Sequence, residues 1–280
     1  MKTKALLFAT FVLLTLLIAG MIGTNDVYQV ADKKAITFGR MIRDVRKANL
    51  VFVGEIHGIR EHHRVELDII RAFHEADAPI VIGLEMFRAE SQKTLDSWVN
   101  STLPLDRFQT AYYDNWKQGW PLYRDIFLYA REHRIPLIGL NIPDEISETI
   151  ARKGFASLSD RERRQLPPGI SCNIDPKYMA FIRKAYSRHA RSGNQQFMNF
   201  CEAQMVWDKA MAWRLVEYLK KNPAATVVVL AGVGHSWKRG IPEQVAQLSK
   251  YTTKVIMPLV PDQVELDTVT IQDADYVVLD

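Results

Sequence analysis

Six short apolar runs recur along the chain, and they constrain its fold more than any other feature of the sequence. The runs are continuous rather than alternating, which is typical of strands buried on both faces of a parallel or mixed sheet. We therefore predict a central sheet with both faces covered. The predicted strands are Leu50–Val53, Ile80–Leu84, Ile135–Leu140, Thr226–Ala231, Lys254–Pro258 and Tyr276–Leu279.

Segments with helical patterning lie between these apolar runs. Strand–helix alternation of this kind predicts an α/β fold in which helices flank the sheet. The stretch from about 150 to 221 contains no convincing strand, so we interpret it as a helical insertion. No linker divides the chain after residue 23, and residues 24–280 are predicted to form one domain. The predicted helices are Glu61–Glu75, Ser91–Val99, Leu122–Glu132, Pro176–Arg191 and Gln195–Lys221.

The first 23 residues are predicted to be a transmembrane or signal segment. Lys2 and Lys4 precede Ala5–Gly23, a run of 19 residues without a charge. A helix needs about 20 apolar residues to cross a bilayer core, so an uncleaved membrane anchor is the preferred interpretation. A cleaved signal peptide is the alternative, although its apolar region is usually shorter and no A-x-A-like site follows. Because the basic residues come first, both interpretations place Thr24 onward outside the cytoplasm.

Charge and cysteine content exclude several classes of protein. The chain has 36 basic and 32 acidic residues, which gives a formal net charge of +4. No basic stripe accompanies this charge, so nucleic acid is not an expected partner. Two cysteines are too few for a disulfide scaffold or a four-cysteine zinc site. Cys172 and Cys201 can pair in an oxidising compartment, and two buried free thiols are the alternative.

Polar side chains follow four of the predicted strands. Glu55, His57, Glu85, Asn141 and His235 stand at strand ends, and both histidines belong to G-x-x-H motifs. Ligand sites of open α/β sheets form beyond the carboxyl ends of strands, so we predict that these residues share one pocket. Histidine with carboxylate suits metal ligation or acid–base catalysis. The alternative is that each histidine only caps a strand end by bonding a backbone carbonyl.

Other residues are candidates for binding a cofactor. Tyr178 and His189 lie in the insertion, and tyrosinate and histidine are both known haem ligands; core packing is the alternative for Tyr178. His62 and His63 begin a predicted helix, where they are either solvated or at the rim of the pocket. The segment from Tyr112 to Tyr123 is rich in aromatic residues. It forms core, a loop lid, or a stacking surface for a flat hydrophobic ligand.

Two further groups of residues lie near the predicted pocket in sequence. Gln204, Asp208 and Met211 have i, i+4, i+7 spacing and so share one helix face. Such a polar pair either reaches the pocket or forms a satisfied buried pair. Lys238 and Arg239 follow His235 directly and are candidate cationic groups, with solvated charges as the alternative.

A set of motifs occurs in an order that resembles a known family. The chain is similar, over about residues 49–245, to the ChaN-type haem-binding uptake lipoproteins of the Tiki, TraB and erythromycin-esterase superfamily. Two positions depart from the family pattern: Met21 stands where a lipidated cysteine is expected, and Val233 where asparagine is expected. The motifs are Gly54–His57, Gly83–Phe87, Gly119–Tyr123, Gly139–Pro143, Gln204–Ala212 and Ala231–Pro242.

The resemblance implies a bacterial cell-envelope protein, on the periplasmic side, that takes part in haem or iron uptake. ChaN-type relatives bind haem through a tyrosine, and a homodimer encloses the cofactor. For this chain the resemblance implies Tyr178 as the candidate iron ligand. It further implies His62, His63 or His189 near the haem propionates.

The wider superfamily implies a different activity for the strand-end residues. Its paired G-x-x-H histidines and strand-end glutamates form the active site of metal-dependent proteases and esterases, and they match Glu55, His57, Glu85 and His235. A carboxylate would be the general base, and His57 and His235 would hold a divalent metal or stabilise the oxyanion. Haem binding is the preferred function, this hydrolase the alternative, and a catalytically silent anchored module the third hypothesis.

Overall fold

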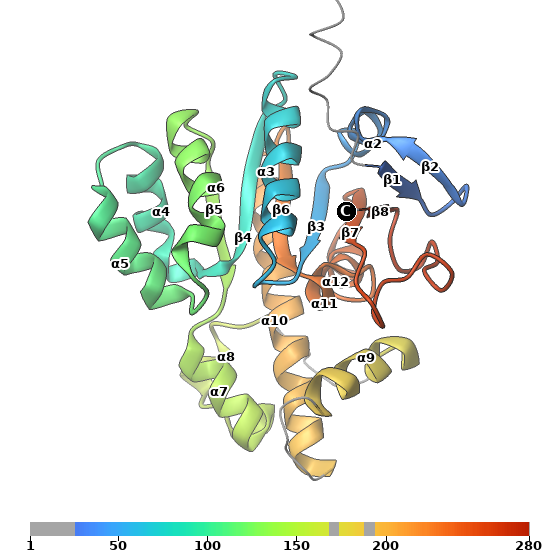
Figure 1. Ribbon diagram of the computed structural model, residues 1–280. Coiled ribbons are helices and arrows are strands. Elements are labelled where there is room, and N and C mark those ends of the chain that lie inside the picture. The colour runs from blue at the N-terminus through green and yellow to red at the C-terminus, as the bar shows by residue number, and fades with distance from the viewer. Residues whose placement is uncertain (1–25, 168–173, 188–193, 280) are drawn as a thin grey trace, which may run out of the picture.

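The computed structural model describes residues 26–167, 174–187 and 194–279. Its core is a mixed sheet of eight strands in the order β2-β1-β8-β7-β3-β6-β4-β5 (Figure 1). The strands from β8 to β5 run parallel to one another, and β1 pairs antiparallel with both β2 and β8. The strands are β1 Asp26–Gln29, β2 Lys34–Thr37, β3 Leu50–Glu55, β4 Ile80–Arg88, β5 Leu137–Asn141, β6 Thr226–Gly232, β7 Thr253–Pro258 and β8 Tyr276–Val278.

Helices cover both faces of this sheet. Alternate residues of each strand enter opposite cores, so Val51 and Val53 of β3 lie in one core and Leu50 and Phe52 in the other. The helices are α2 Phe38–Val45, α3 Arg60–His74, α4 Gln92–Val99, α5 Leu105–Asn115, α6 Trp120–Glu132, α7 Asp144–Lys153, α8 Asp160–Arg163, α9 Pro176–Ser187, α10 Asn194–Lys221, α11 Val233–Ser236 and α12 Ile241–Leu248.

The two cores contain different helices. The first core contains residues of α2 to α6, and the second contains residues of α9, α10 and α12. This double coverage explains why the strand sequences are apolar without alternation, because neither face of a central strand meets water.

The predicted helical insertion is present and has two parts. Between β5 and β6 the described residues form helices and turns, with no strand. One face of α10 packs with α7 in a third core, in which Val206 and Ala210 meet Ile146 and Ile150. The second half of α10 returns to the sheet and buries Leu215 in the second core. The helices α7, α8, α9 and the first half of α10 therefore lie beyond the carboxyl edge of the sheet (Figure 1).

All six predicted strands and all five predicted helices are present, with ends shifted by a few residues where the structure describes them. Residues 188–191 of the predicted helix Pro176–Arg191 lie outside the described residues. The sequence prediction missed the hairpin of β1 and β2, which makes the sheet mixed rather than wholly parallel. It also missed the helices α2, α5, α7 and α12. The hairpin turns at Lys33, whose φ of 50° is unusual for a residue other than glycine.

The predicted signal or anchor, residues 1–23, lies outside the described residues. Within the described part of the chain, no helix is both long and apolar enough to cross a membrane. Cys201 is disulfide-bonded. Cys172, the other cysteine of the sequence, lies outside the described residues.

Candidate functional site

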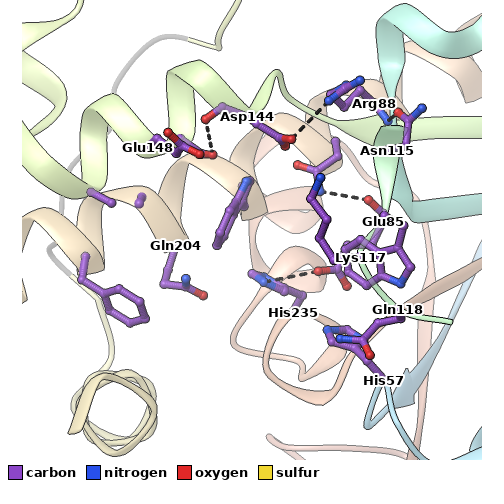
Figure 2. Close-up of a pocket in the computed structure, with 17 residues that line it drawn as sticks. His57, Glu85, Arg88, Asn115, Lys117, Gln118, Asp144, Glu148, Gln204 and His235 are labelled. Carbon is purple, nitrogen blue, oxygen red and sulfur yellow. Dashed lines mark hydrogen bonds and ion pairs between the residues drawn. The ribbon is translucent and has the colours of Figure 1, made fainter. Parts of the chain in front are cut away.

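A pocket of about 490 Å³ lies between the carboxyl edge of the sheet and the helices α7 and α10 (Figure 2). Its size falls within the range of ordinary small-molecule sites. The ends of β3, β6, β4 and β5 are neighbours in the sheet, so residues far apart in sequence meet here. The pocket is lined by His57, Glu85, Arg88, Asn115, Trp116, Lys117, Gln118, Asn141, Asp144, Ser147, Glu148, Ala151, Phe200, Ala203, Gln204, Trp207 and His235.

The first histidine of the pocket is fixed by a buried carboxylate. His57 Nδ1 lies 2.8 Å from Oε1 of Glu55, the last residue of β3, and His57 itself stands in the turn that follows the strand. Tyr123 donates a hydrogen bond from its hydroxyl to the same carboxylate, 2.8 Å from Oε1. Because Nδ1 is held behind the pocket wall, Nε2 is the imidazole nitrogen left for a ligand.

Glu55 and His57 each stabilise the charged form of the other. Burial raises the pKa of Glu55, but hydrogen bonds with His57 and His63 outweigh it and lower that pKa to about 2. Burial lowers the pKa of His57, but its hydrogen bond with Glu55 and the charge of Glu85 raise it above the ordinary value. Glu55 is therefore ionised at neutral pH, and a ligand that uses the lone pair of His57 Nε2 must displace a proton.

The second histidine is held in the same way from the other side. His235 Nδ1 lies 2.7 Å from Asp208 Oδ1 of α10. Asp208 Oδ2 accepts a hydrogen bond of 2.5 Å from the hydroxyl of Tyr178, on α9. Burial lowers the pKa of His235, but the carboxylates of Glu85 and Asp208 raise it to about 9.

Glu85 lies between the two imidazoles. Its Oε1 is 3.7 Å from His235 Nε2, and its Oε2 accepts a 2.7 Å hydrogen bond from the backbone N–H of Gly232. A Cβ atom at Gly232 would lie only 3.0 Å from the Cε1 of His57. Glycine at this position therefore leaves room for the first imidazole beside the second G-x-x-H motif.

Aromatic and cationic side chains form the rest of the pocket. Trp116 meets His57 edge to face, with ring centroids 4.9 Å apart, and Trp207 meets His235 at 5.8 Å. Phe200 adds a third ring from α10. Arg88 and Lys117 bring positive charge to the wall, and Arg88 is paired with Asp144 at 3.2 Å. Flat apolar walls with cations beside them suit a planar ligand that carries acidic groups.

The structure brings together most of the predicted strand-end residues. His57, Glu85, Asn141 and His235 line the pocket, while Glu55 is buried behind His57. Asn141 donates a 2.9 Å hydrogen bond from its side chain to the backbone carbonyl of Glu85.

Residues of α10 form the pocket wall opposite the sheet edge. Gln204 and Asp208 were predicted to share one face of this helix, and both lie on the side that faces the pocket. Gln204 lines the pocket, and Asp208 contacts His235. Lys238 and Arg239 do not line the pocket and are instead paired with Asp275 and Asp273.

The candidate cofactor residues lie elsewhere. Tyr178 is fully buried in the second core, and burial together with the charge of Asp208 raises the pKa of its hydroxyl well above the ordinary value. His62 and His63 are buried rather than solvated: His62 Nδ1 accepts the backbone N–H of Ile56, and His63 contacts Glu55. None of the three lines the pocket. His189 lies outside the described residues.

Sequence reasoning overlooked two partners of the site. Tyr123 lies on α6 and follows Glu55, to which it donates a hydrogen bond, by 68 residues in the sequence. Nothing in the local sequence indicates that contact. Glu66, which bonds His63, follows it at i+3 on one helix, and that spacing alone was a usable signal. The aromatic segment divides: Tyr112, Trp120 and Tyr123 are core, while Trp116 reaches the pocket.

Comparison with known proteins identifies the family of the chain. Residues 41–245 match the family described as "Haem-binding uptake, Tiki superfamily, ChaN". The chain belongs to this family. No curated protein matches the chain.

Two solved structures share the fold. The structure "Cofacial heme binding to ChaN of Campylobacter jejuni" has a TM-score of 0.73 and 20% sequence identity, over 92% of this chain and 97% of that one. A mutant of the erythromycin esterase EreC in its open conformation has a TM-score of 0.51 and 13% identity, over 83% and 76% of the two chains. The predicted membership of the ChaN family, within the Tiki superfamily, is thus confirmed.

Proposed function

We propose that this ChaN-family protein binds haem in the pocket at the carboxyl edge of the sheet, with Nε2 of His57 as the iron ligand. Haem, when bound, would supply an iron that accepts a lone pair from a protein side chain. The observation that carries the proposal is the His57–Glu55 pair. In metal-binding histidines, the ring N–H that does not face the metal commonly donates a hydrogen bond to a carboxylate. His57 is also the more exposed imidazole, with 32% of its side chain accessible against 12% for His235.

The other pocket residues also fit a haem. Trp116, Trp207 and Phe200 offer flat apolar surface for the macrocycle. Lys117 offers positive charge for a propionate, and charge-assisted hydrogen bonds from such a group are the stronger ones. Arg88 also lines the pocket but is paired with Asp144 and Glu90. Tyr178 fits less well as the iron ligand, since its hydroxyl is buried and already bonded to Asp208.

Haem titration of the full chain in detergent micelles, followed by Soret absorbance, tests this assignment. We expect saturation near one haem per chain and a loss of affinity of at least about 10-fold in His57→Ala. His133→Ala is the matched control, because His133 is exposed and does not line the pocket. If Tyr178→Phe no longer saturates with haem while His57→Ala does, Tyr178 and not His57 is the iron ligand. A titration without saturation would exclude haem as the ligand.

A glycine substitution probes the same pocket without removing a polar group. We expect Gly232→Ala to displace His57, because the new methyl group would lie 3.0 Å from its ring, and to weaken haem binding about 10-fold. Gly58→Ala is the matched control, since a Cβ there meets no atom within 4 Å. Equal haem affinity in both variants would show that His57 is not held against Gly232.

Cellular role and assembly belong to the same proposal. We propose that the protein serves haem uptake on the periplasmic side of a bacterial envelope, attached or exported by its first 23 residues. A second copy of the chain, covering the open side of the pocket, would enclose the haem. Sedimentation velocity with and without haem measures whether loading shifts the protein from monomer to dimer.

One observation favours a second candidate, metal-dependent hydrolysis of a peptide or ester. His57 and His235 each have Nδ1 bound to a buried carboxylate, and Glu85 lies between them. Two histidines and a glutamate are a known donor set for catalytic zinc, with Glu55 fixing His57. We expect Glu85→Gln to abolish any zinc-dependent hydrolysis, since it removes the carboxylate but keeps an acceptor for Gly232. Under haem binding alone, the same variant still saturates with haem, because the proposed iron ligand His57 remains in place.

A further inference from the structure

Behind His57, three side chains form a second cluster that does not line the pocket. Glu55, His63 and Glu66 each offer a ligand atom, and these atoms lie within 4.8 Å of one another. The three residues are 1%, 3% and 0% exposed. His63 Nδ1 is 3.0 Å from Glu55 Oε2 and 3.0 Å from Glu66 Oε2. One imidazole nitrogen thus faces two carboxylates in a space closed to water.

Among the described residues, the two buried carboxylates of the cluster form ion pairs only with the imidazoles of His57 and His63, and with no lysine or arginine. Glu66 Oε1 is buried and has no hydrogen-bond partner within that part of the chain. A buried carboxylate without full pairing is costly. The unpartnered oxygen therefore indicates a missing cationic or proton-bearing neighbour at this point.

The orientation of His63 matches that of a metal-binding histidine. Its Nε2 lies 3.0 Å from the backbone carbonyl oxygen of His57, which accepts a hydrogen bond from the Nε2–H. In the neutral imidazole, this hydrogen bond leaves the lone pair on Nδ1, directed at the two carboxylates. Two ligand atoms around a tetrahedral zinc ion lie about 3.4 Å apart. The two separations of 3.0 Å from His63 Nδ1 would open by about 0.4 Å around such an ion, and all three ligand atoms lie within 4.8 Å of one another.

We propose that Glu55, His63 and Glu66 bind a divalent transition-metal ion, such as Zn²⁺, at a structural site separate from the haem pocket. Two carboxylates and one neutral imidazole balance a charge of +2, and these ligand types suit zinc. Glu66 Oε1 is the natural additional ligand. The ion enters while the chain folds, because the folded cluster is closed to solvent.

The position of Glu55 gives this ion a consequence for the pocket. Glu55 Oε2 faces the cluster, while Oε1 holds His57 Nδ1 at 2.8 Å. An ion bound at the cluster would fix the carboxylate and, through it, the orientation of His57. Glu66 and His63 then act as positioning residues, and neither touches the pocket.

Refolding with and without zinc tests the proposal. The full chain is unfolded in guanidinium with EDTA, then refolded with Zn²⁺ or with chelator, and passed through a desalting column that contains EDTA. We expect about one zinc ion per chain to survive this step, and the zinc-refolded protein to melt about 5 °C or more above the metal-free protein. Wild-type protein that retains no zinc and melts at one temperature in both cases would overturn the proposal.

Variants separate this site from the pocket. Glu66→Gln should lose the retained zinc and the rise in melting temperature, whereas Glu61→Gln, an exposed position on the same helix, should keep both. His235→Ala should also keep both, because His235 lies in the pocket and outside the cluster. Zinc kept by Glu66→Gln but lost by His235→Ala would place the ion in the pocket and overturn the proposal. If Glu66→Gln does not fold, the wild-type comparison decides by itself. The haem proposal is tested by Soret absorbance, and the zinc proposal by retained zinc and melting temperature. Because the two readouts differ, one proposal can be refuted while the other is supported.

Discussion

Replacing Asp208 with alanine should lower the free energy of unfolding by about 3–5 kcal/mol. Asp208 is fully buried on α10, and it accepts hydrogen bonds from Tyr178 at 2.5 Å and from His235 at 2.7 Å. Alanine would leave a buried hydroxyl and a buried ring N–H without an acceptor, and each unsatisfied group costs about 1–3 kcal/mol. It would also leave the charge of His235 without its nearest partner. Guanidinium unfolding followed by circular dichroism measures the loss.

Three variants separate the causes of that loss. Asp208→Asn keeps one acceptor oxygen and the side-chain shape, so it should cost less than alanine. Tyr178→Phe removes one hydrogen bond and should cost about 1–2 kcal/mol. Asp267→Ala, at an exposed position, should change stability by less than about 0.5 kcal/mol. An alanine variant at position 208 as stable as the asparagine variant would show that the buried network contributes little.

The location of the site follows from the sequence because it depends on a property shared by all parallel strands. Runs such as Leu50–Val53 and Thr226–Ala231 are continuously apolar, which predicts strands buried on both faces. Parallel strands end at one edge, so Glu55 and His235 were expected to meet there. The order of the strands is a different matter. That β6 lies between β3 and β4 is decided by packing of residues far apart in sequence, and no local pattern encodes it.

The depth of individual side chains could not be predicted in the same way. Tyr178 and Met179 are adjacent on one helix, and their order does not say which one faces inward; α10 buries Tyr178 by providing Asp208 as its acceptor. His62 and His63 stand in a polar stretch that suggests solvent exposure. His63 is buried because Glu55, from another element, supplies its partner. The periodicity of a sequence segment does not predict which residues of distant elements its side chains contact.

The missed hairpin has a local physical cause. β1 and β2 have four residues each and include Asp26, Gln29 and Lys34, residue types that are uncommon in strands or neutral toward them. A short polar hairpin is only marginally stable alone. Its stability here comes from pairing with β8, in which Val27 lies opposite Val278. Tertiary pairing therefore overrides a weak local preference.

The stability of the metal-free protein should depend on pH through the buried cluster, with opposite signs on its acid and alkaline sides. Burial raises the pKa of Glu55 but its histidine partners lower it to about 2, so its contribution is present above about 4.5 and is lost as pH falls toward 2. Burial lowers the pKa of His63 but both glutamates raise it to about 10. Its contribution is therefore full below about 6.5 and is lost as pH rises toward 10.

Glu66 adds a third dependence that a single substitution can isolate. Burial and the charge of Glu55 raise its pKa to about 7, so folding favours the protonated acid and stability falls as pH rises from about 4.5 to 7. The expected loss over that interval is on the order of 3 kcal/mol. Glu66→Gln mimics the neutral acid, so its unfolding free energy, measured by guanidinium titration with EDTA present, should lack this fall but keep the decline above about 6.5 that belongs to His63. Parallel pH curves for the wild type and Glu66→Gln between 4.5 and 7 would mean that Glu66 is ionised in the folded protein, with the charge of His63 balancing both carboxylates.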